Sequence, residues 1–174
     1  MRTFKLMAVL FFLITACSES KISKEEAEQI LKIKYPRAID MYIYGGDPKY
    51  AKMLQEAGLD SEGYVSIKKS KKLGDGSGWV TFNEKALPYI LETSESEKKD
   101  LVQKVKAAEE QLSEITTIEQ DDDNGTAEIT YTTKVTGLTP FARLIKLKEG
   151  EVKQRKAYAI KYYDEWRLKE KNAK

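Results

Sequence analysis

The sequence predicts an α+β fold in which an N-terminal unit of helices, a strand and a hairpin packs with a C-terminal antiparallel sheet. Capping signals and helical periodicity dominate up to residue 93, whereas residues 126–168 alternate between apolar and polar side chains with the period of a strand. The stretch from Thr93 to Asp100 is charged and lacks apolar periodicity, so it marks the boundary. We therefore expect an α+β unit over residues 23–93 and an antiparallel β unit over residues 101–170.

The first residues of the chain have the order of a secretory signal peptide. Two basic residues, Arg2 and Lys5, come first, and an apolar run from Leu6 to Ile14 follows. Small residues then precede Cys17. Because a membrane-spanning helix needs about 20 apolar residues, this run is too short to span a bilayer comfortably. We expect residues 1–16 to be removed as a signal peptide.

The tetrad Ile14-Thr15-Ala16-Cys17 resembles the lipobox of bacterial lipoproteins. The resemblance covers only the first seventeen residues, where basic start, apolar core, small residues and cysteine follow one another as in that family. It implies a diacylglycerol on the sulfur of Cys17 and usually a third acyl chain on its new amino group. Two or three chains anchor a domain stably, since each buried CH₂ contributes about 0.8 kcal/mol. A plain secreted protein with an incidental cysteine is the alternative.

Residues 17–22 would then form a short lipidated tether. Ser18 follows the cysteine, at the position where an aspartate typically retains such lipoproteins in an inner membrane. By resemblance to that sorting rule, we expect a cell-envelope protein held in the outer membrane rather than the inner one. The sequence leaves open whether the domain faces the periplasm or the cell surface.

Two helices are expected from their capping residues. Ser23 and Glu26 have the spacing of a capping box, and Pro36 should end this first helix. Asp47-Pro48 supplies an N-cap followed by proline at the first helical position. Gly58 is the natural left-handed stop of this second helix.

A strand is expected between the two helices, from Ile39 to Tyr44, because apolar and polar residues alternate there. Tyr42 and Tyr44 fall on the face opposite the apolar alternation. Tyrosine suits interfaces because it presents a large face with a polar edge, so these two residues are candidates for partner binding. Ordinary cross-strand packing is the alternative.

A hairpin is expected from Tyr64 to Lys68 and from Trp79 to Phe82, followed by a short helix or turn from Asn83 to Leu91. Over residues 23–91, the order helix, strand, helix, hairpin, helix resembles a winged-helix domain, although such a domain normally packs two helices before the wing and one is found here. The resemblance would imply a nucleic-acid or protein-binding module, with the hairpin lysines on the wing. We prefer a solvated hairpin tip as the interpretation.

The C-terminal unit is expected to be a sheet. Leu101–Gln111 is ambiguous between helix and strand, and we favour a long, bulged strand that runs into Ile118. Asn124-Gly125 is a strong hairpin signal. Further strands are expected at Ala127–Val135, Tyr158–Tyr162 and Trp166–Leu168.

The stretch Asp121–Gly125 has the composition of a calcium loop but not its spacing. With Gly125 in the sixth position, the first position falls on Gln120 and the twelfth on Tyr131, where the loop needs an aspartate and a bidentate glutamate. We therefore expect a hairpin turn here and no metal site.

Composition narrows the chemistry further. The chain has no histidine and Cys17 is its only cysteine, so the commonest general base, thiol nucleophiles, disulfides and His- or Cys-based metal sites are excluded from the mature protein. The chain has 30 basic and 28 acidic residues, and removal of Arg2 and Lys5 leaves 28 of each. A neutral balance argues against a polyanionic partner, so we expect no nucleic acid.

Together these observations predict a lipid-anchored envelope protein that binds or supports an envelope partner without catalysis. The expected partners are the membrane, through the acyl chains on Cys17, and an envelope protein or glycan; no cofactor, metal or catalytic residue is expected. The alternative from another class is a histidine-free enzyme acting on envelope glycan through carboxylates or tyrosine. Such an enzyme needs two carboxylates roughly 5 to 9.5 Å apart in a cleft.

Overall fold

The computed structural model describes residues 21–72 and 74–169, and it has an α+β fold. The expected signal peptide, Cys17 and most of the expected tether lie outside the described residues. The helices are α1 (Lys24–Lys32), α2 (Pro48–Glu56) and α3 (Glu95–Lys99), with 3-10 turns η1 (Glu84–Tyr89) and η2 (Pro140–Ile145). None of the helices in this part of the chain is long and apolar enough to cross a membrane.

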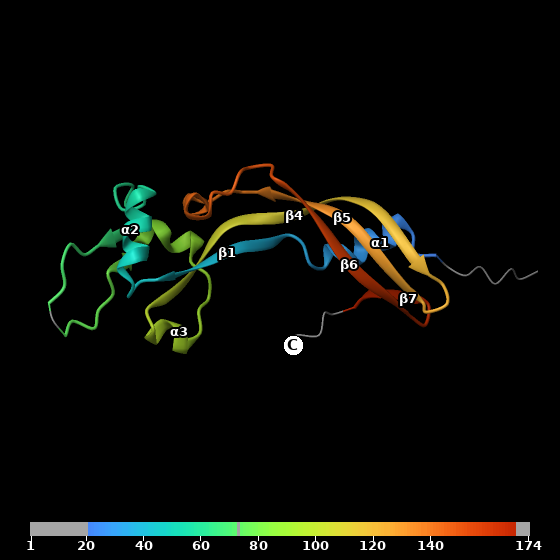
Figure 1. Cartoon of the computed structure of the whole chain (residues 1–174), viewed down its shortest axis with the longest axis horizontal. Coiled ribbons are helices and arrows are strands. Elements are labelled where there is room, and N and C mark those ends of the chain that lie inside the picture. The colour runs from blue at the N-terminus through green and yellow to red at the C-terminus, as the bar shows by residue number, and fades with distance from the viewer. Residues whose placement is uncertain (1–20, 73, 170–174) are drawn as a thin grey trace, which may run out of the picture.

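A curled, five-stranded antiparallel sheet organises the molecule, with strand order β1-β4-β5-β6-β7. Its strands are β1 (Arg37–Tyr44), β4 (Val102–Asp121), β5 (Thr126–Thr136), β6 (Val152–Tyr162) and β7 (Glu165–Leu168). A separate hairpin pairs β2 (Val65–Ile67) with β3 (Val80–Phe82). In Figure 1, α2 lies at one end of the long axis and α1 at the other, with β1 and β4 running between them.

The predicted capping signals are confirmed. The Ser23 hydroxyl accepts a hydrogen bond from the Glu26 backbone N–H, and the Glu26 carboxylate accepts one from the Ser23 N–H at 2.8 Å. Asp47 caps α2 in the same way by accepting from the Lys49 N–H. The first helix ends at Lys32, earlier than Pro36 required, because the chain tightens there into bonds between residues three apart.

The edge strand β1 joins the same sheet as the C-terminal strands. Its register runs from Arg37 opposite Glu110 to Tyr44 opposite Val102. The sequence analysis assigned this strand to an N-terminal unit and did not foresee the pairing, because alternation identifies a strand but not its neighbour. Since β1 pairs with β4 and not with the β2–β3 hairpin, the elements of residues 23–91 do not form one sheet of their own.

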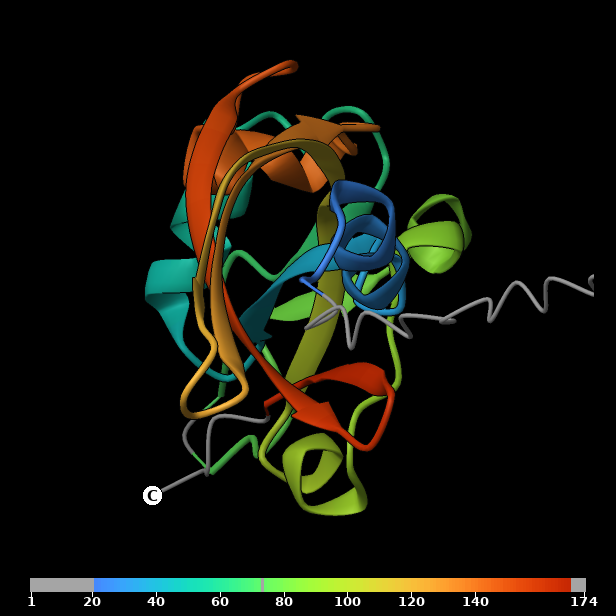
Figure 2. The ribbon, with the colours of Figure 1, turned by 90° about the vertical axis from the view of Figure 1, so that its right-hand side faces the viewer.

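The long, bulged strand predicted for the start of the C-terminal unit is confirmed as β4. Its register against β5 shifts between Leu112 and Glu114 and again between Ile115 and Thr117. These irregularities bend the strand, and Figure 2 shows the sheet curling around α1. The short helix α3, within the expected boundary, was missed because it buries none of its residues and so carries no apolar stripe.

Two apolar clusters cover the core face of the sheet, one at each end. The α1 cluster includes Leu31, Ile115, Ile129, Tyr131 and Trp166. The α2 cluster includes Ile43, Leu54, Leu59, Val105 and Phe141. Because β4 contributes Val105 to one cluster and Ile115 to the other, the middle of this strand bridges two separate cores.

Candidate functional site

Tyr42 and Tyr44 lie on the outer face of β1, opposite the core face. They are 41% and 46% exposed, whereas Ile43 between them is fully buried in the α2 cluster. The ring of Tyr44 packs against the ring of Tyr50 at a centroid distance of 5.3 Å. The ammonium of Lys104, which is directly opposite Tyr42 on β4, lies 5.5 Å from the centre of the Tyr42 ring. The two tyrosines therefore present aromatic surface beside a cation.

The charge beside the tyrosines is held in place. The Nζ of Lys104 lies 2.6 Å from Oδ2 of Asp40 on the same outer face. This hydrogen bond raises the pKa of Lys104, so its ammonium stays charged around neutral pH. Because β1 is an edge strand of the large sheet, its backbone N–H and C=O groups on the outer side also face away from β4. We call Asp40, Tyr42, Tyr44 and Lys104 the β1 surface.

An ion cluster around one buried carboxylate links β1 to the sheet at the gap between the two apolar clusters. The side chain of Glu110 is 2% exposed. Its Oε2 accepts a hydrogen bond from Nε of Arg37 at 2.7 Å and lies 2.5 Å from Nη2 of the same guanidinium. Its Oε1 accepts from Nε and Nη2 of Arg155, at 3.0 and 2.8 Å, and from the Thr133 hydroxyl. We call Arg37, Glu110, Thr133 and Arg155 the waist cluster.

The waist cluster keeps Glu110 ionised. Burial alone would raise the pKa of this carboxyl, but hydrogen bonds from Thr133, Arg155 and Arg37 outweigh it and lower the pKa to about 2. A carboxyl with such a low pKa cannot serve as a general acid near neutral pH. Its members come from β1, β4, β5 and β6, so the cluster holds four strands in register.

A cavity of about 280 Å³ opens beside the waist cluster. Besides Arg37, Glu110 and Arg155, it is lined by Ala38, Ile39, Asp40 and Lys153. Lys153 has its own partner, Glu151, at 3.3 Å. The cavity is therefore rich in guanidinium N–H groups, and its two carboxylates are paired, Glu110 with the arginines and Asp40 with Lys104.

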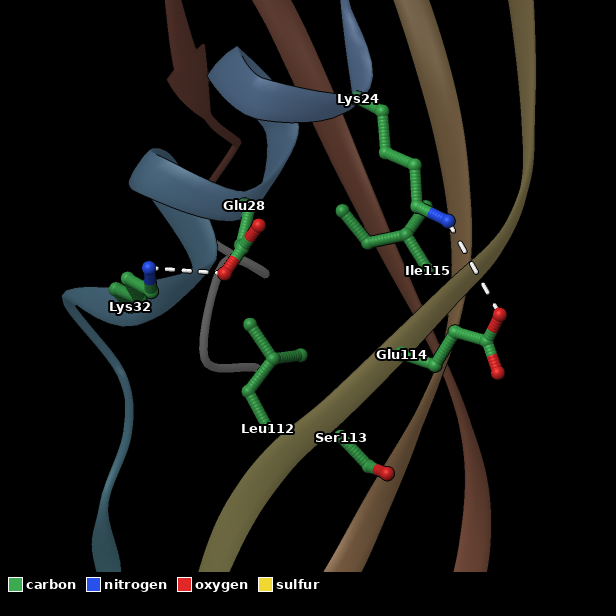
Figure 3. Close-up of a pocket in the computed structure, with 7 residues that line it drawn as sticks. All are labelled: Lys24, Glu28, Lys32, Leu112, Ser113, Glu114 and Ile115. Atoms are coloured by element: carbon green, nitrogen blue, oxygen red, sulfur yellow. Dashed lines mark ion pairs between the residues drawn. The ribbon is translucent and has the colours of Figure 1, made fainter.

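A second cavity lies between α1 and β4, and Figure 3 shows the residues that line it. Its volume is about 190 Å³. Its charged groups are paired with one another: Lys32 lies 2.8 Å from Glu28, and Lys24 lies 4.0 Å from Glu114. The hydrogen bond with Lys32 lowers the pKa of Glu28. Both carboxylates that line this cavity are therefore paired with lysines of α1.

The Asp-rich stretch forms the predicted hairpin turn between β4 and β5. The carboxylate of Asp121 accepts hydrogen bonds from the backbone N–H of Asn124 at 3.2 Å and from its side-chain amide at 2.7 Å. Gly125 has a φ of +58°, the left-handed conformation that the turn requires. Within residues 21–72 and 74–169, no group of three or more acidic side chains is placed to hold a metal ion.

Sequence reasoning placed Tyr42 and Tyr44 but missed the waist cluster. The available signal was Glu110 itself, a carboxylate flanked at two-residue spacing by Ala108 and Leu112 on a half-buried strand. The predicted lipidation residue, Cys17, lies outside the described residues. No protein-family model, curated protein or solved structure matches the chain, so its function is argued from its own residues.

Proposed function

We propose that this chain is a lipid-anchored protein of the cell envelope that binds or supports an envelope partner without catalysis. The observation that carries the proposal is the tetrad Ile14-Thr15-Ala16-Cys17, preceded by a basic start and an apolar run. That order fits acylation of Cys17 after removal of residues 1–16. Ser18 in place of aspartate supports the outer membrane as the destination.

The start of the described chain supports an anchored orientation. The backbone N–H of Ile22 donates to the side-chain oxygen of Gln120 at 2.8 Å, next to the turn between β4 and β5. Ile22 is five positions after Cys17, and five steps of up to about 3.6 Å each reach at most about 18 Å. The α1 end of the molecule would therefore stay close to the bilayer, and the α2 end would extend away from it (Figure 1).

The β1 surface is the best-supported site for the partner. Tyr42 and Tyr44 offer large, rigid faces at low entropic cost, and Lys104 adds a charge beside them. The waist cluster secures β1 against the rest of the sheet, so this surface is organised before a partner arrives. Preorganisation of this kind reduces the entropic cost of association.

The carboxyl groups favour binding over the glycan-cleaving alternative. A glycosidase needs one carboxylic acid whose pKa is raised. Every carboxyl in the described part of the chain with a resolved shift has a lowered pKa instead. These are Glu26, Glu28, Glu62, Asp75, Glu97, Glu109, Glu110, Asp121 and Glu128.

The anchor is tested by expressing the full chain in a bacterial host and labelling it with a traceable fatty acid. The wild-type protein should carry label and fractionate with membranes, whereas Cys17→Ala should carry none. Ser18→Asp is the matched control: it should keep the label but move from the outer to the inner membrane. Label that persists in Cys17→Ala would refute acylation at this residue.

A further inference from the structure

A stripe of large apolar side chains is exposed on the outer face of β6 and at its end. Tyr158, Ile160 and Tyr162 are 54%, 39% and 55% exposed, and Tyr163 in the following turn is 84% exposed. Ala159, between Tyr158 and Ile160, points to the opposite face and is fully buried. The rings of Tyr162 and Tyr163 contact each other edge to face at a centroid distance of 4.8 Å. We call these four exposed residues the β6 patch.

The β6 patch lies at the same end of the molecule as the start of the described chain. Ile160 is directly opposite Thr126 on β5, and the backbone N–H of Lys161 donates to the carbonyl of Gly125 at 2.8 Å. Ile22 is tied to Gln120 on the other arm of the same hairpin. Figure 1 shows this hairpin beside the turn between β6 and β7, at the end opposite α2.

The tether is short enough to bring the patch to the bilayer. If Cys17 is acylated, the lipid surface lies within about 18 Å of Ile22 along the extended chain. Layers of packed secondary structure are about 10 Å apart, so the outer face of the sheet lies within that reach. The patch is therefore held near lipid whenever the anchor is inserted.

The backbone conformation of Tyr163, in the turn between β6 and β7, is energetically unfavourable for an aromatic residue. Tyr163 has a φ of +55°, a left-handed conformation that glycine or asparagine adopts at lower cost than an aromatic residue. Its ring gains little from burial, because it is almost fully exposed. Strained residues of this kind cluster at functional sites.

The charges around the patch are of both signs. Asp164 follows Tyr163 in the turn, and Lys169 donates its backbone N–H to the carbonyl of Tyr158 at 2.8 Å. Lys156 pairs with Glu128, and Arg167 pairs with Glu165 at 3.0 Å. The guanidinium of Arg167 also lies 5.2 Å from the centre of the Tyr162 ring. The patch thus offers aromatic and aliphatic surface with little net charge, which suits the headgroup boundary of a bilayer, where tyrosine is enriched.

We propose that the β6 patch rests in the headgroup region of the bilayer that holds the anchor and so fixes the orientation of the domain on the membrane. The occupant is the lipid surface itself. This inference rests on the proposed function, because only an anchored chain is held near lipid. The contact is apolar rather than ionic, so it requires no anionic lipid and persists at high salt.

The test couples the mature chain, through its only thiol at Cys17, to a maleimide lipid in phosphatidylcholine vesicles with brominated acyl chains. Bromine quenches tryptophan that contacts the membrane. Tyr163→Trp should lose most of the emission of its introduced tryptophan, at low and at high salt. Tyr44→Trp, on the β1 surface, is the matched control, and its introduced tryptophan should lose no emission. The emission of Trp79 and Trp166, measured in the wild-type protein, is subtracted from each variant.

Tyr158→Trp places a second reporter on β6. Circular dichroism of each variant verifies that it is folded.

Equal emission from the three introduced tryptophans in brominated and ordinary vesicles would overturn the proposal and leave the patch for a protein partner. Quenching that disappears at high salt would also overturn it, because the contact would then be ionic. Chemical coupling makes this result independent of acylation in cells. Failure of acylation in cells would therefore refute the anchor, and with it the contact in cells, whereas failure of quenching in the coupled protein would refute the membrane contact and leave the anchor standing.

Discussion

Arg37 and Glu110 are direct partners across β1 and β4, and the guanidinium Nε donates to the carboxylate at 2.7 Å. This pair stands at the start of the edge strand that carries Tyr42 and Tyr44. On the other side of the carboxylate, Arg155 closes the cluster from β6. A single buried carboxylate therefore links the start of β1, the strand that presents the proposed binding surface, to β6.

Removal of this carboxylate should destabilise the fold strongly. Glu110→Gln leaves two guanidinium groups beside a neutral amide, and their side chains are 53% and 37% exposed, so water compensates part of the loss. The loss of charge-assisted hydrogen bonds should therefore cost about 2 kcal/mol. Urea denaturation at pH 7 measures the change. Glu109→Gln, which alters the half-buried neighbour paired with Lys106 on the opposite face of β4, is the control and should change the midpoint much less. Equal midpoints for the two variants would contradict the role of the waist cluster.

The same carboxylate predicts a pH dependence. The pKa of Glu110 is about 2 in the folded protein and near 4.5 when unperturbed, so its ionised form stabilises the fold above pH 4.5. That stabilisation is lost as the pH falls through this window toward 2. The difference in unfolding free energy between wild type and Glu110→Gln should therefore shrink between pH 5 and pH 3, as measured by urea denaturation. A difference that stays constant over this range would count against the low pKa.

Truncation of two neighbouring residues of β1 should reduce the unfolding free energy by different amounts. Ile43→Ala removes a fully buried side chain from the α2 cluster and should cost about 3 kcal/mol of unfolding free energy. Tyr44→Ser removes a half-exposed ring and its contact with Tyr50, which should cost less than about 1.5 kcal/mol. Denaturant melts of both variants measure this contrast. A larger loss for Tyr44 would make it a core residue instead of a surface one.

Divalent cations should not change the stability of the protein. The carboxylate of Asp121 already accepts two hydrogen bonds from Asn124, and the turn reaches its conformation through Gly125 without an ion. Thermal melts with micromolar calcium or with a chelator should therefore have the same midpoint, and purified protein should carry no stoichiometric zinc. A calcium-induced rise of several degrees would show that the acidic turn binds metal.

Local signals predicted the elements well, because each depends on residues close in the sequence. Ser23 with Glu26 and Asp47 with Pro48 set the helix starts, and Asn124-Gly125 set the hairpin. The waist cluster was not predictable in this way. Arg37 and Glu110 are 73 residues apart, and only the pairing of β1 with β4 brings them together.

In the candidate site too, features that depend on local sequence were predictable and features that depend on tertiary structure were not. Alternation on β1 was enough to place Tyr42 and Tyr44 on the outer face, because side-chain direction in a strand has a period of two. Tyr158 and Tyr162 were expected on a strand, but their exposure was not foreseen. Their exposure depends on which face α1 covers, and that is set by tertiary structure.

We have proposed that an anchored chain presents the β1 surface to an envelope partner. The most direct test places a photo-reactive phenylalanine analogue at position 42 and irradiates intact cells. The analogue at Val152, a strand residue on β6 that is 59% exposed against 41% for Tyr42, is the control. We predict a discrete crosslinked adduct from position 42 that is absent from position 152, weakened by Tyr44→Ser and lost in Cys17→Ala. Identical adducts from both positions, or none from position 42, would contradict the claim.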